Sequence, residues 1–474
     1  MTSIKQSVTQ SQERSELATC RVIVLDEDRS SVLLARAQGG FVLPSVEIPR
    51  CQRVAENLTA AMKSKWCREV VCLFALRVRT LENDSNRANY QVAEGANGTG
   101  THDSRTAWAP ISALRQDRFE DPEDYRSIRE CLNQCDRYQP DDRTPFARKN
   151  WFQELRSWVE EVIHPMGLAL TGRFTQLNAS PSFSLIRFET DRTAIWFKAV
   201  GEPNRREFKI TVQLAQQFPQ HVAKVLAIRP DWNGWLSPEI EGISLAETRE
   251  VGRWETSAAD LARLQVESIG KVRPVEQLGA RDFRVPTLAD RVTPFLELVD
   301  RLREQPAKVA PPVLSQKELF ILGERVQKAL YRLDEIRVPA TLGHLDLNPG
   351  NIIFCQTGCV FLDWAEAYVG SPFLSFQYLL EHFRRTVGNE PEDAQSLQAS
   401  YAAVWKEVIS EDEVTEALEL APLVAVFAYA AADIWAQPDK LGGGAYLWSL
   451  TRRMQREANQ MVERREKSEL LLGR

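Results

Sequence analysis

Apolar residues change their spacing along the chain, and each change predicts a different kind of structure. Before residue 140, short apolar runs predict strands with one helix among them. In chain order these are strands at 20–26 and 31–37, a helix at 52–66 and a strand at 70–80. A strand-rich stretch continues to about residue 240, after which helical spacing dominates, most clearly at 254–268, 288–305 and 317–336. The pattern predicts an α+β chain in which a β-rich piece precedes a helical piece, with a cleft between two lobes.

The chain has 474 residues, more than one hydrophobic core normally serves, so two or three domains are expected. The stretch 136–150 is polar, holds two prolines and precedes a new helical pattern, which makes it the expected main boundary. The predicted division is a disordered tail at 1–17, a small domain at 18–140 and a larger domain at 150–474. Within the larger domain, one lobe is expected at about 150–240 and a helical lobe at about 241–474.

Charge and composition narrow the class of partner. The 59 basic and 65 acidic residues give a net charge of −6, which argues against nucleic acid or an anionic membrane surface as the main partner. The first twenty residues lack the apolar segment of a secretory signal. The longest apolar run, 420–435, is short for a membrane span and contains Pro422 and Asp433, so we expect a buried core helix. We expect a cytoplasmic protein with no membrane partner, and the sequence predicts no particular oligomeric state.

Eight cysteines do not make a disulfide framework in a chain of this length. Two pairs have short spacings, Cys131 with Cys135 and Cys355 with Cys359, and four thiolates brought together could bind zinc. No other metal-ligand spacing lies near either pair. We therefore favour reduced thiols packed in the core over a zinc site.

The segment 341–367 combines acidic and amide side chains with an apolar stretch that Gly358 interrupts. Residues 351–355 and 359–363 are expected to pair as an antiparallel hairpin around a three-residue turn that Gly358 ends. With Thr357 at the centre of the turn, Asn351 faces Asp363. In the same register Ile353 faces Phe361 and Cys355 faces Cys359, and all six side chains lie on one face.

This hairpin would bring a carboxamide and a carboxylate together at its open end. Oxygen ligands such as Asn351 and Asp363 suit Mg²⁺, which takes few protein ligands and keeps positions for water and phosphate. Asp346 lies on the loop just before and is expected to approach the same end. A carboxylate beside a metal–phosphate site is placed to orient and deprotonate an attacking hydroxyl.

The same residues carry a resemblance to a known family. His344, Asp346 and Asn351 fit the pattern H-x-D-x-x-x-x-N, and Asp363 follows in "LDW". This resembles the core of the protein-kinase-like superfamily, and more closely the aminoglycoside phosphotransferase and choline kinase families. The resemblance implies a two-lobed kinase-like fold for 150–474, with Asp346 as catalytic base, Asn351 and Asp363 as Mg²⁺ ligands and His344 as loop support. Leu345 replaces the glycine of the usual His-Gly-Asp, and the alternative is an Asp/Asn-rich turn that caps two strands.

The resemblance also assigns an ATP-binding role to residues of the first lobe. Lys198 lies late in the apolar strand "AIWFKAV" and would contact the α- and β-phosphates, with Glu207 of the next helix as its partner. Glu202 is the alternative partner, and a lysine that reaches solvent at a sheet edge is the alternative reading of Lys198. Between the strands of 177–190 the loop has no glycine, so Ser182 and Ser184 would contact phosphates instead. Backbone groups at 238–240, including Glu239 and Ile240, would meet the adenine.

The first domain is similar to a Nudix domain in strand order and in the closing segment 107–114. A Nudix helix carries glutamates that bind metal, but the corresponding residues 59–67 contain no carboxylate. Lys63 and Lys65 in that stretch would repel a divalent cation. We therefore interpret residues 18–140 as a non-catalytic Nudix-like α/β/α domain that binds a ligand or docks, with a plain α+β domain as the alternative.

The leading functional hypothesis is an ATP-dependent, Mg²⁺-assisted phosphotransferase that moves the γ-phosphoryl group to a hydroxyl of a small molecule. The alternative is a pseudokinase that binds a nucleotide or metabolite and signals through the first domain. A Nudix-type pyrophosphohydrolase would need the missing glutamates. Glu366 could pair with an amine of the acceptor, but we favour the alternative of a solvated surface glutamate.

Overall fold

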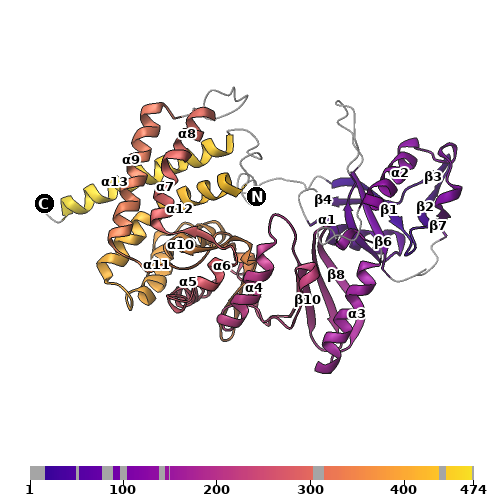
Figure 1. Ribbon diagram of the computed structural model, residues 1–474, viewed down its shortest axis with the longest axis horizontal. Helices are drawn as coiled ribbons and strands as arrows, with labels where there is room; N and C mark the ends of the chain where they lie inside the picture. Colours follow the sequence, from indigo (N-terminus) through magenta and orange to yellow (C-terminus); the bar gives the residue numbers. More distant parts are fainter. Residues whose placement is uncertain are drawn as a thin grey trace. The chain divides into compact units, whose positions relative to one another are not determined.

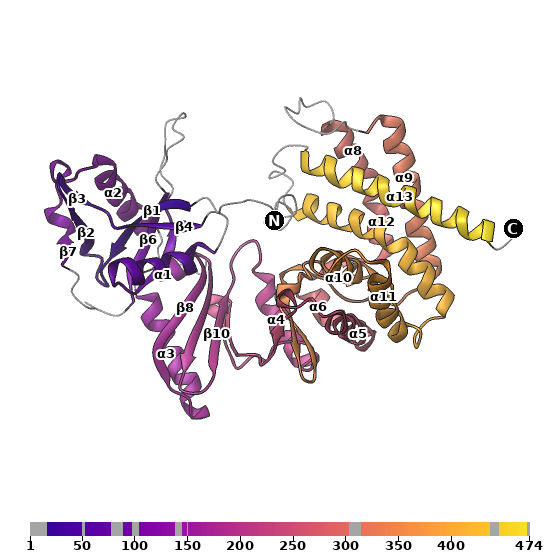
Figure 2. The same cartoon turned by 180° about the vertical axis from the view of Figure 1, so that it is seen from behind.

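The computed structural model describes residues 17–49, 53–76, 89–96, 104–137, 145–148, 150–302, 314–436 and 445–471. The chain divides into two compact units, both drawn in Figures 1 and 2. The N-terminal unit comprises Met1–Phe208 and Lys224–Glu239, and the C-terminal unit comprises Lys209–Ala223 and Ile240–Arg474. Strands dominate the first and helices the second, so the predicted mixed α+β class is confirmed.

The N-terminal unit begins with a seven-stranded mixed sheet. Its strands are β1 (Leu17–Leu25), β2 (Ser31–Ala37), β3 (Gly40–Val42), β4 (Ser45–Pro49), β5 (Val70–Ala75), β6 (Asn89–Gly95) and β7 (Thr106–Pro110). The strand order is β3-β2-β1-β6-β5, with β4 paired to β1 and β7 paired to β2. β1 runs parallel to β6 and antiparallel to β2 and β4.

Side chains of β1 are buried on both faces of this sheet. Val22 and Val24 share a core with α1 (Val54–Trp66), whereas Ile23 and Leu25 share a core with α2 (Pro122–Arg137). Because side chains alternate along a strand, a continuous apolar run such as this one needs a helix on each face. The predicted strands at 20–26 and 31–37 and the helix at 52–66 are present as β1, β2 and α1. The strand predicted at 70–80 ends at Ala75, and residues 77–80 lie outside the described part of the chain.

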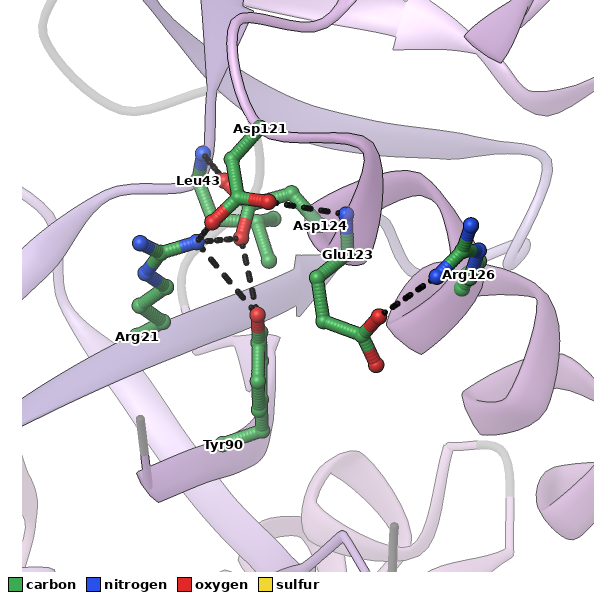
Figure 3. A network of polar contacts seen from close by, with 7 residues as sticks. All are labelled: Arg21, Leu43, Tyr90, Asp121, Glu123, Asp124 and Arg126. Carbon is green, nitrogen blue, oxygen red and sulfur yellow. Dashed lines mark hydrogen bonds and ion pairs between the residues drawn. The ribbon is translucent and has the colours of Figure 1, made fainter. Parts of the chain in front are cut away.

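A polar network fastens the start of α2 to the sheet (Figure 3). Arg21 of β1 forms ion pairs with Asp121, at 2.5 Å, and with Asp124. The hydroxyl of Tyr90 donates to Asp124 at 3.1 Å, and the backbone N–H of Leu43 donates to the second oxygen of Asp124 at 2.9 Å. Burial, together with the nearby Asp124 carboxylate, raises the pKa of Tyr90 to about 12, so its hydroxyl keeps its proton as a donor. The network is internally satisfied, as a structural joint requires.

A second, antiparallel sheet completes the N-terminal unit. It contains β8 (Leu170–Ser180), β9 (Phe183–Thr190), β10 (Ala194–Ala199), β11 (Ala227–Arg229) and β12 (Gly234–Pro238), in the order β11-β12-β10-β9-β8. The helix α3 (Trp151–Ile163) shares one buried core with this sheet. Edge-to-face aromatic contacts fill the core, among them Phe146 with Trp151, Phe197 and Trp232.

The two sheets of the N-terminal unit are joined by a side chain. The carboxamide of Gln176 on β8 accepts from the backbone N–H of Cys72 at 2.7 Å and donates to the carbonyl of Cys72 at 3.0 Å. The same apolar core contains residues from both sides of the predicted boundary, such as Leu25, Val71, Trp151 and Phe197. The stretch 136–150 therefore does not separate the compact units of the structure. The division into a Nudix-like domain and a kinase-like domain stays a prediction.

The C-terminal unit consists of helices around two small sheets. One sheet has the order β13-β16-β17, and the other has the order β14-β18-β15. The strands are β13 (Ile243–Ser244), β14 (Arg281–Phe283), β15 (Thr341–His344), β16 (Ile352–Cys355), β17 (Gly358–Phe361) and β18 (Ala367–Gly370). The helices are α4 (Arg206–Gln217, which starts in the N-terminal unit), α5 (Val251–Glu267), α6 (Arg273–Gln277), α7 (Val285–Asp290), α8 (Val292–Leu302), α9 (Gln316–Glu335), α10 (Phe373–Thr386), α11 (Pro391–Trp405), α12 (Glu411–Ala436) and α13 (Ala445–Leu471).

The helix α12 contains the long apolar run that composition alone could assign to a membrane. The span Glu411–Ala432 is the only described helix that passes a test of length and hydropathy for crossing a bilayer. However, 72% of its most apolar window is buried inside the protein. Burial of this extent is typical of a core helix, so the run is accounted for by packing within the C-terminal unit.

Candidate active site

The loop after β15 is built around one buried histidine. His344 is fully buried, and its Nδ1 accepts the backbone N–H of Asp346 at 3.1 Å. Its Nε2 lies 2.9 Å from the carbonyl oxygen of Leu362. Because Nδ1 is an acceptor, Nε2 must carry the proton and donate it to Leu362. The ring also packs on Trp364, with centroids 4.8 Å apart, so His344 ties the loop to the residues on either side of Asp363.

Asp346 itself is exposed, and an asparagine that the sequence analysis did not single out supports it. The side-chain Nδ2 of Asn348 donates to Oδ1 of Asp346 at 3.2 Å. Oδ1 of Asn348 accepts the N–H of Gly350 at 3.0 Å, which closes an Asx turn in "NPG". The turn motif was visible in the sequence, but its contact with Asp346 was not. Asn348 leaves one carboxylate oxygen of Asp346 for a further partner.

Asn351 is held by hydrogen bonds of its side-chain Nδ2 and of its backbone carbonyl. Its Nδ2 donates to the carbonyl of Asp346 at 2.9 Å, and its own carbonyl accepts the N–H of Leu362 at 2.8 Å. Asp363 follows Leu362 directly and has a left-handed backbone, with φ 62° and ψ 61°. A non-glycine residue in this region is strained, and such residues cluster at functional sites. The structure thus places Asn351, Asp346 and the residue before Asp363 in one hydrogen-bonded cluster.

The predicted register of the hairpin is wrong by one residue. Cys355 pairs with Gly358, Ile353 with Val360 and Ile352 with Phe361, around the two-residue turn Gln356–Thr357. Asn351 therefore lies opposite Leu362 and does not face Asp363 across the strands; Ile353 does not face Phe361, and Cys355 does not face Cys359. Asp363 lies beyond the last paired residue of β17 and has a left-handed backbone, so strand alternation does not define the direction of its side chain.

The register was predicted wrongly because the role of Gly358 was misinterpreted. Gly358 was interpreted as the last residue of a three-residue turn, but it is the first paired residue of β17. A Cβ there would lie 2.8 Å from Oδ2 of Asp260, which accepts the N–H of Cys359 at 2.8 Å. The φ of +129° at Gly358 would also strain any other residue. A contact with α5, invisible to local sequence, requires the glycine.

In the N-terminal unit, Lys198 of β10 and Glu207 of α4 form an ion pair. The Nζ–Oε1 distance is 2.5 Å, and the side chains are 15% and 2% exposed. The structure thus places Glu207, and not Glu202, against the lysine. Lys198 also lies 5.9 Å from the centroid of the Trp235 ring. Two charges this buried are stable only as a pair, which fixes the position of the ammonium group.

The serines of the β8–β9 turn differ in their accessibility. Ser182 is half-buried, and its N–H donates to Oγ of Ser180 at 3.3 Å. The turn lies so close to Gly201 that a Cβ at 201 would be 2.4 Å from Cβ of Ser182. Ser184 is fully buried, and its hydroxyl has no hydrogen-bond partner in the structure. Its burial places Ser184 beneath the surface, whereas Ser182 is accessible.

Some polar groups of the residues expected to bind the adenine already form hydrogen bonds within the protein. The N–H of Glu239 donates to the carbonyl of Ala194 at 2.9 Å, and its carboxylate accepts from Arg187 at 2.8 Å. Of the polar groups of Glu239, only the backbone carbonyl remains to bind the adenine base. Ile240, the other residue expected there, follows directly in the chain. The carboxylate of Glu366 pairs with Arg281, so it is not a free ligand for an amine of an acceptor.

One further residue near Asp346 was missed by the sequence analysis. His382 lies on α10 and is within electrostatic range of the Asp346 carboxylate. Burial, and to a smaller extent the charge of Arg385, lowers the pKa of His382 to about 4, although the Asp346 carboxylate acts in the opposite direction. The sequence held no signal for this proximity, because 36 residues separate the two positions.

The donor groups of the candidate site determine which metal ion they could hold. Among the residues that the structure describes, no three His, Cys, Asp or Glu side chains gather to hold an ion. The zinc alternative therefore gains no support. Asn351 and Asp363 offer an amide and a carboxylate oxygen, a hard donor set that fits Mg²⁺, which completes its shell with water and phosphate. The two lysines that were expected to repel a cation in the first domain lie on α1 and have polar partners. Lys63 pairs with Glu69 at 2.7 Å, and Lys65 donates to the carbonyl of Ser45 at 2.8 Å.

Comparison with known proteins adds a family match for part of the chain. Residues 200–408 match the model of the phosphotransferase enzyme family, a segment that contains Glu207 and the whole loop from His344 to Asp363. This part of the chain is thus similar to phosphotransferases. No curated protein sequence matches the chain significantly.

Several solved structures align with much of this chain, at low sequence identity and with TM-scores below 0.5. A Plasmodium vivax ethanolamine kinase is 11% identical, with a TM-score of 0.44, over 69% of this chain and 94% of that one. A putative aminoglycoside phosphotransferase from Ralstonia eutropha is 15% identical, with a TM-score of 0.43, over 66% and 98%. A macrolide 2′-phosphotransferase from Brachybacterium faecium is 16% identical, with a TM-score of 0.40, over 62% and 97%.

Proposed function

We propose that the protein is an ATP-dependent phosphotransferase that moves the γ-phosphoryl group to a hydroxyl of a small molecule. The observation that carries the proposal is the hydrogen-bonded loop in which His344 bridges Asp346 and Leu362 while Asn351 binds the carbonyl of Asp346. This loop lies within the segment that matches the phosphotransferase enzyme family. An Asp/Asn-rich turn that only caps strands would not need a buried histidine to fix both ends.

Asp346 is the proposed catalytic base. Its carboxylate is exposed, and Asn348 binds one of its oxygens, so the other can accept the proton of an acceptor hydroxyl. The acceptor oxygen forms a bond to the γ-phosphorus, the bond from that phosphorus to the β–γ bridging oxygen breaks, and ADP leaves. Positioning of the hydroxyl supplies most of the rate, because phosphoryl transfer needs little covalent chemistry from the protein.

The second requirement is that the negative charge of the nucleotide phosphates is neutralised. Lys198 would contact the α- and β-phosphates, and Glu207 would hold the ammonium group in place. Asn351 and Asp363 would hold Mg²⁺, which neutralises phosphate charge when bound. Ser182 would contribute backbone and hydroxyl groups, and the carbonyl of Glu239 with the backbone of Ile240 would meet the adenine.

The test is ADP release from Mg-ATP in a screen of hydroxylated amines, aminoglycosides and sugars. With a turned-over acceptor in hand, Asp346→Ala and Asp346→Asn are expected to lower kcat by about 10²–10⁴-fold while Mg-ATP binding persists. Asp412→Asn, an exposed carboxylate of α12, is the matched control and should leave kcat unchanged. Unchanged turnover in both Asp346 variants would eliminate the assigned base.

A second candidate is a nucleotide- or metabolite-binding pseudokinase. The buried hydroxyl of Ser184 and the occupied N–H of Glu239 favour it, because both reduce the groups available to a nucleotide. Thermal stabilisation by Mg-ATP without transfer to any acceptor in the screen would support this candidate over the first.

A further inference from the structure

The helix α9 has one face that no described residue covers. Its opposite face is buried, with Leu322, Val326 and Leu330 in the core of the C-terminal unit. On the open face, Phe320 and Tyr331 are 68% and 65% exposed, more than any other large apolar side chain in the described part of the chain. They are three turns apart and lie on the same side of the helix. Isolated exposed apolar residues are ordinary, but two aligned aromatics on one helix indicate a contact surface.

The open face carries a regular pattern. Its central positions are spaced four, three, four, three and four residues apart, the spacing of a coiled-coil seam. We call these the seam residues: Lys317, Ile321, Glu324, Lys328, Tyr331 and Glu335. All six are exposed. The pattern means that a second helix could follow the seam along nearly the whole length of α9.

Polar contacts mark the edges of this face and leave the seam open. On one side Arg325 bonds Asn459 of α13 and Arg332 bonds Glu416 of α12 at 3.0 Å. On the other side Gln327 donates to the carbonyl of Ala289, at the end of α7, at 3.1 Å. These contacts anchor α9 in its own unit. The helix is therefore a fixed platform and does not need to be ordered by a partner.

The seam residues are complementary to their own reversed sequence. Around Val326, Lys317 and Glu335 are equidistant, and so are Ile321 and Tyr331, and Glu324 and Lys328. Reversing the helix against a copy of itself therefore sets every lysine against a glutamate and each isoleucine against a tyrosine. A parallel copy in register would instead set lysine against lysine and glutamate against glutamate, which is unfavourable. Glu335 also forms an ion pair with Arg332 of its own helix. At each end of the paired helices, one glutamate would therefore face two basic groups, Arg332 of its own copy and Lys317 of the other copy.

We propose that α9 is a homodimer interface, in which two copies of this chain pack their α9 helices antiparallel across a two-fold axis near Val326. A two-fold interface pairs position i of one copy with position j of the other and position j with i, which the seam satisfies. An unrelated partner would place no such symmetry on this sequence, and a purely solvated face would not need Phe320 and Tyr331. Phe320 flanks the seam and extends the apolar contact at both ends of the pair.

The interface can be tested by exchanging its charges in the full-length protein. Sedimentation equilibrium from about 1 to 100 μM is expected to show a monomer–dimer equilibrium for the wild type. Glu324→Lys alone sets lysine against lysine twice per dimer, and Lys328→Glu alone sets glutamate against glutamate twice. Each is expected to raise the dimer Kd about tenfold or more. The double exchange Glu324→Lys with Lys328→Glu restores opposite charges and is expected to return Kd to within about threefold of the wild type.

Controls separate the interface from net charge and from folding. Glu407→Lys and Lys224→Glu make the same changes of charge at exposed positions elsewhere and should leave Kd unchanged. Phe320→Ser with Tyr331→Ser should abolish dimerisation, with circular dichroism confirming the fold of every variant. A wild type that is monomeric at 100 μM, or a dimer that the α9 variants leave unchanged, would overturn the proposal. So would single variants that weaken the dimer but are not rescued by the double exchange.

Discussion

The carboxamide of Gln176 hydrogen-bonds both the N–H and the carbonyl of Cys72, 104 residues earlier in the chain. Pairing between β5 and β6 shifts register between Cys72 and Phe74, so the backbone of β5 is irregular at this point. Gln176 is 1% exposed, and its amide takes the place that a neighbouring strand would fill. One side chain thus connects the first sheet of the N-terminal unit to the second.

Gln176→Met is expected to destabilise the protein by about 2–3 kcal/mol. Methionine keeps the volume but leaves two buried backbone groups unpaired, each of which costs about 1–3 kcal/mol. Urea unfolding followed by tryptophan fluorescence measures the change. Gln116→Met, at an exposed position, is the matched control and should stay within about 0.5 kcal/mol. An equally small effect of Gln176→Met would mean that water replaces the amide.

Lys198→Met is expected to cost more stability than the double variant Lys198→Met with Glu207→Leu. Removing the lysine leaves a carboxylate that is 2% exposed without its partner, at a cost of about 3–5 kcal/mol. Replacing both charges removes that penalty, so the double variant should recover at least about half of the loss. Denaturant unfolding of the two proteins gives the comparison.

Lys209→Met, an exposed lysine on the same helix as Glu207, controls for the loss of a positive charge. It should change the free energy of unfolding by less than about 0.5 kcal/mol. A double variant that is less stable than Lys198→Met would show that the pair contributes through packing rather than through charge.

Features set by short-range sequence were predicted well. The strands β1 and β2 and the helices α1, α5 and α9 follow from apolar spacing, because each buries a face that its own period defines. The pair of Lys198 and Glu207 spans nine residues across one strand-to-helix connection. The family resemblance assigned Glu207 as the partner and left Glu202 as the alternative, and the structure pairs Lys198 with Glu207.

Features set by distant contacts were not predicted. The hairpin was expected, but its register depends on Asp260, which lies 98 residues before Gly358 and excludes a side chain there. The proximity of His382 to Asp346 depends on where α10 packs. The joint between Gln176 and Cys72 crosses the boundary that composition suggested. Phe146 and Ala147, at the end of the polar stretch 136–150, are buried in the core that both sides of that boundary share, which the polarity of the stretch did not indicate.

His344→Phe is expected to lower kcat about 10- to 100-fold and to leave KM for ATP within about twofold, if the proposed phosphotransferase activity is present. Phenylalanine keeps the packing on Trp364 but loses the bonds to Asp346 and Leu362, so the loop shifts while the fold remains. Steady-state kinetics with the acceptor from the screen measure both constants. His164→Phe, an exposed histidine, is the control. A variant with unchanged kcat would show that the histidine supports the fold and not the position of Asp346.

The pH dependence of stability should include a contribution from His382. Its pKa of about 4 in the folded protein lies below the value of about 6.5 for an unfolded histidine, chiefly because of burial. Between these values the unfolded chain binds more protons at this residue, so stability falls as the pH falls. The contribution is fully present above pH 6.5 and is lost progressively down to pH 4, by about 3 kcal/mol in all.

Comparison of the wild type with His382→Gln isolates this contribution. The difference in unfolding free energy between the two proteins is expected to change by up to about 3 kcal/mol between pH 7 and pH 4, with the wild type losing more. A titration of the His382 ring by NMR provides the link to the candidate site. Because the Asp346 carboxylate raises the pKa of His382, Asp346→Asn should lower it further. An unchanged titration in that variant would place the histidine outside the electrostatic reach of the proposed base.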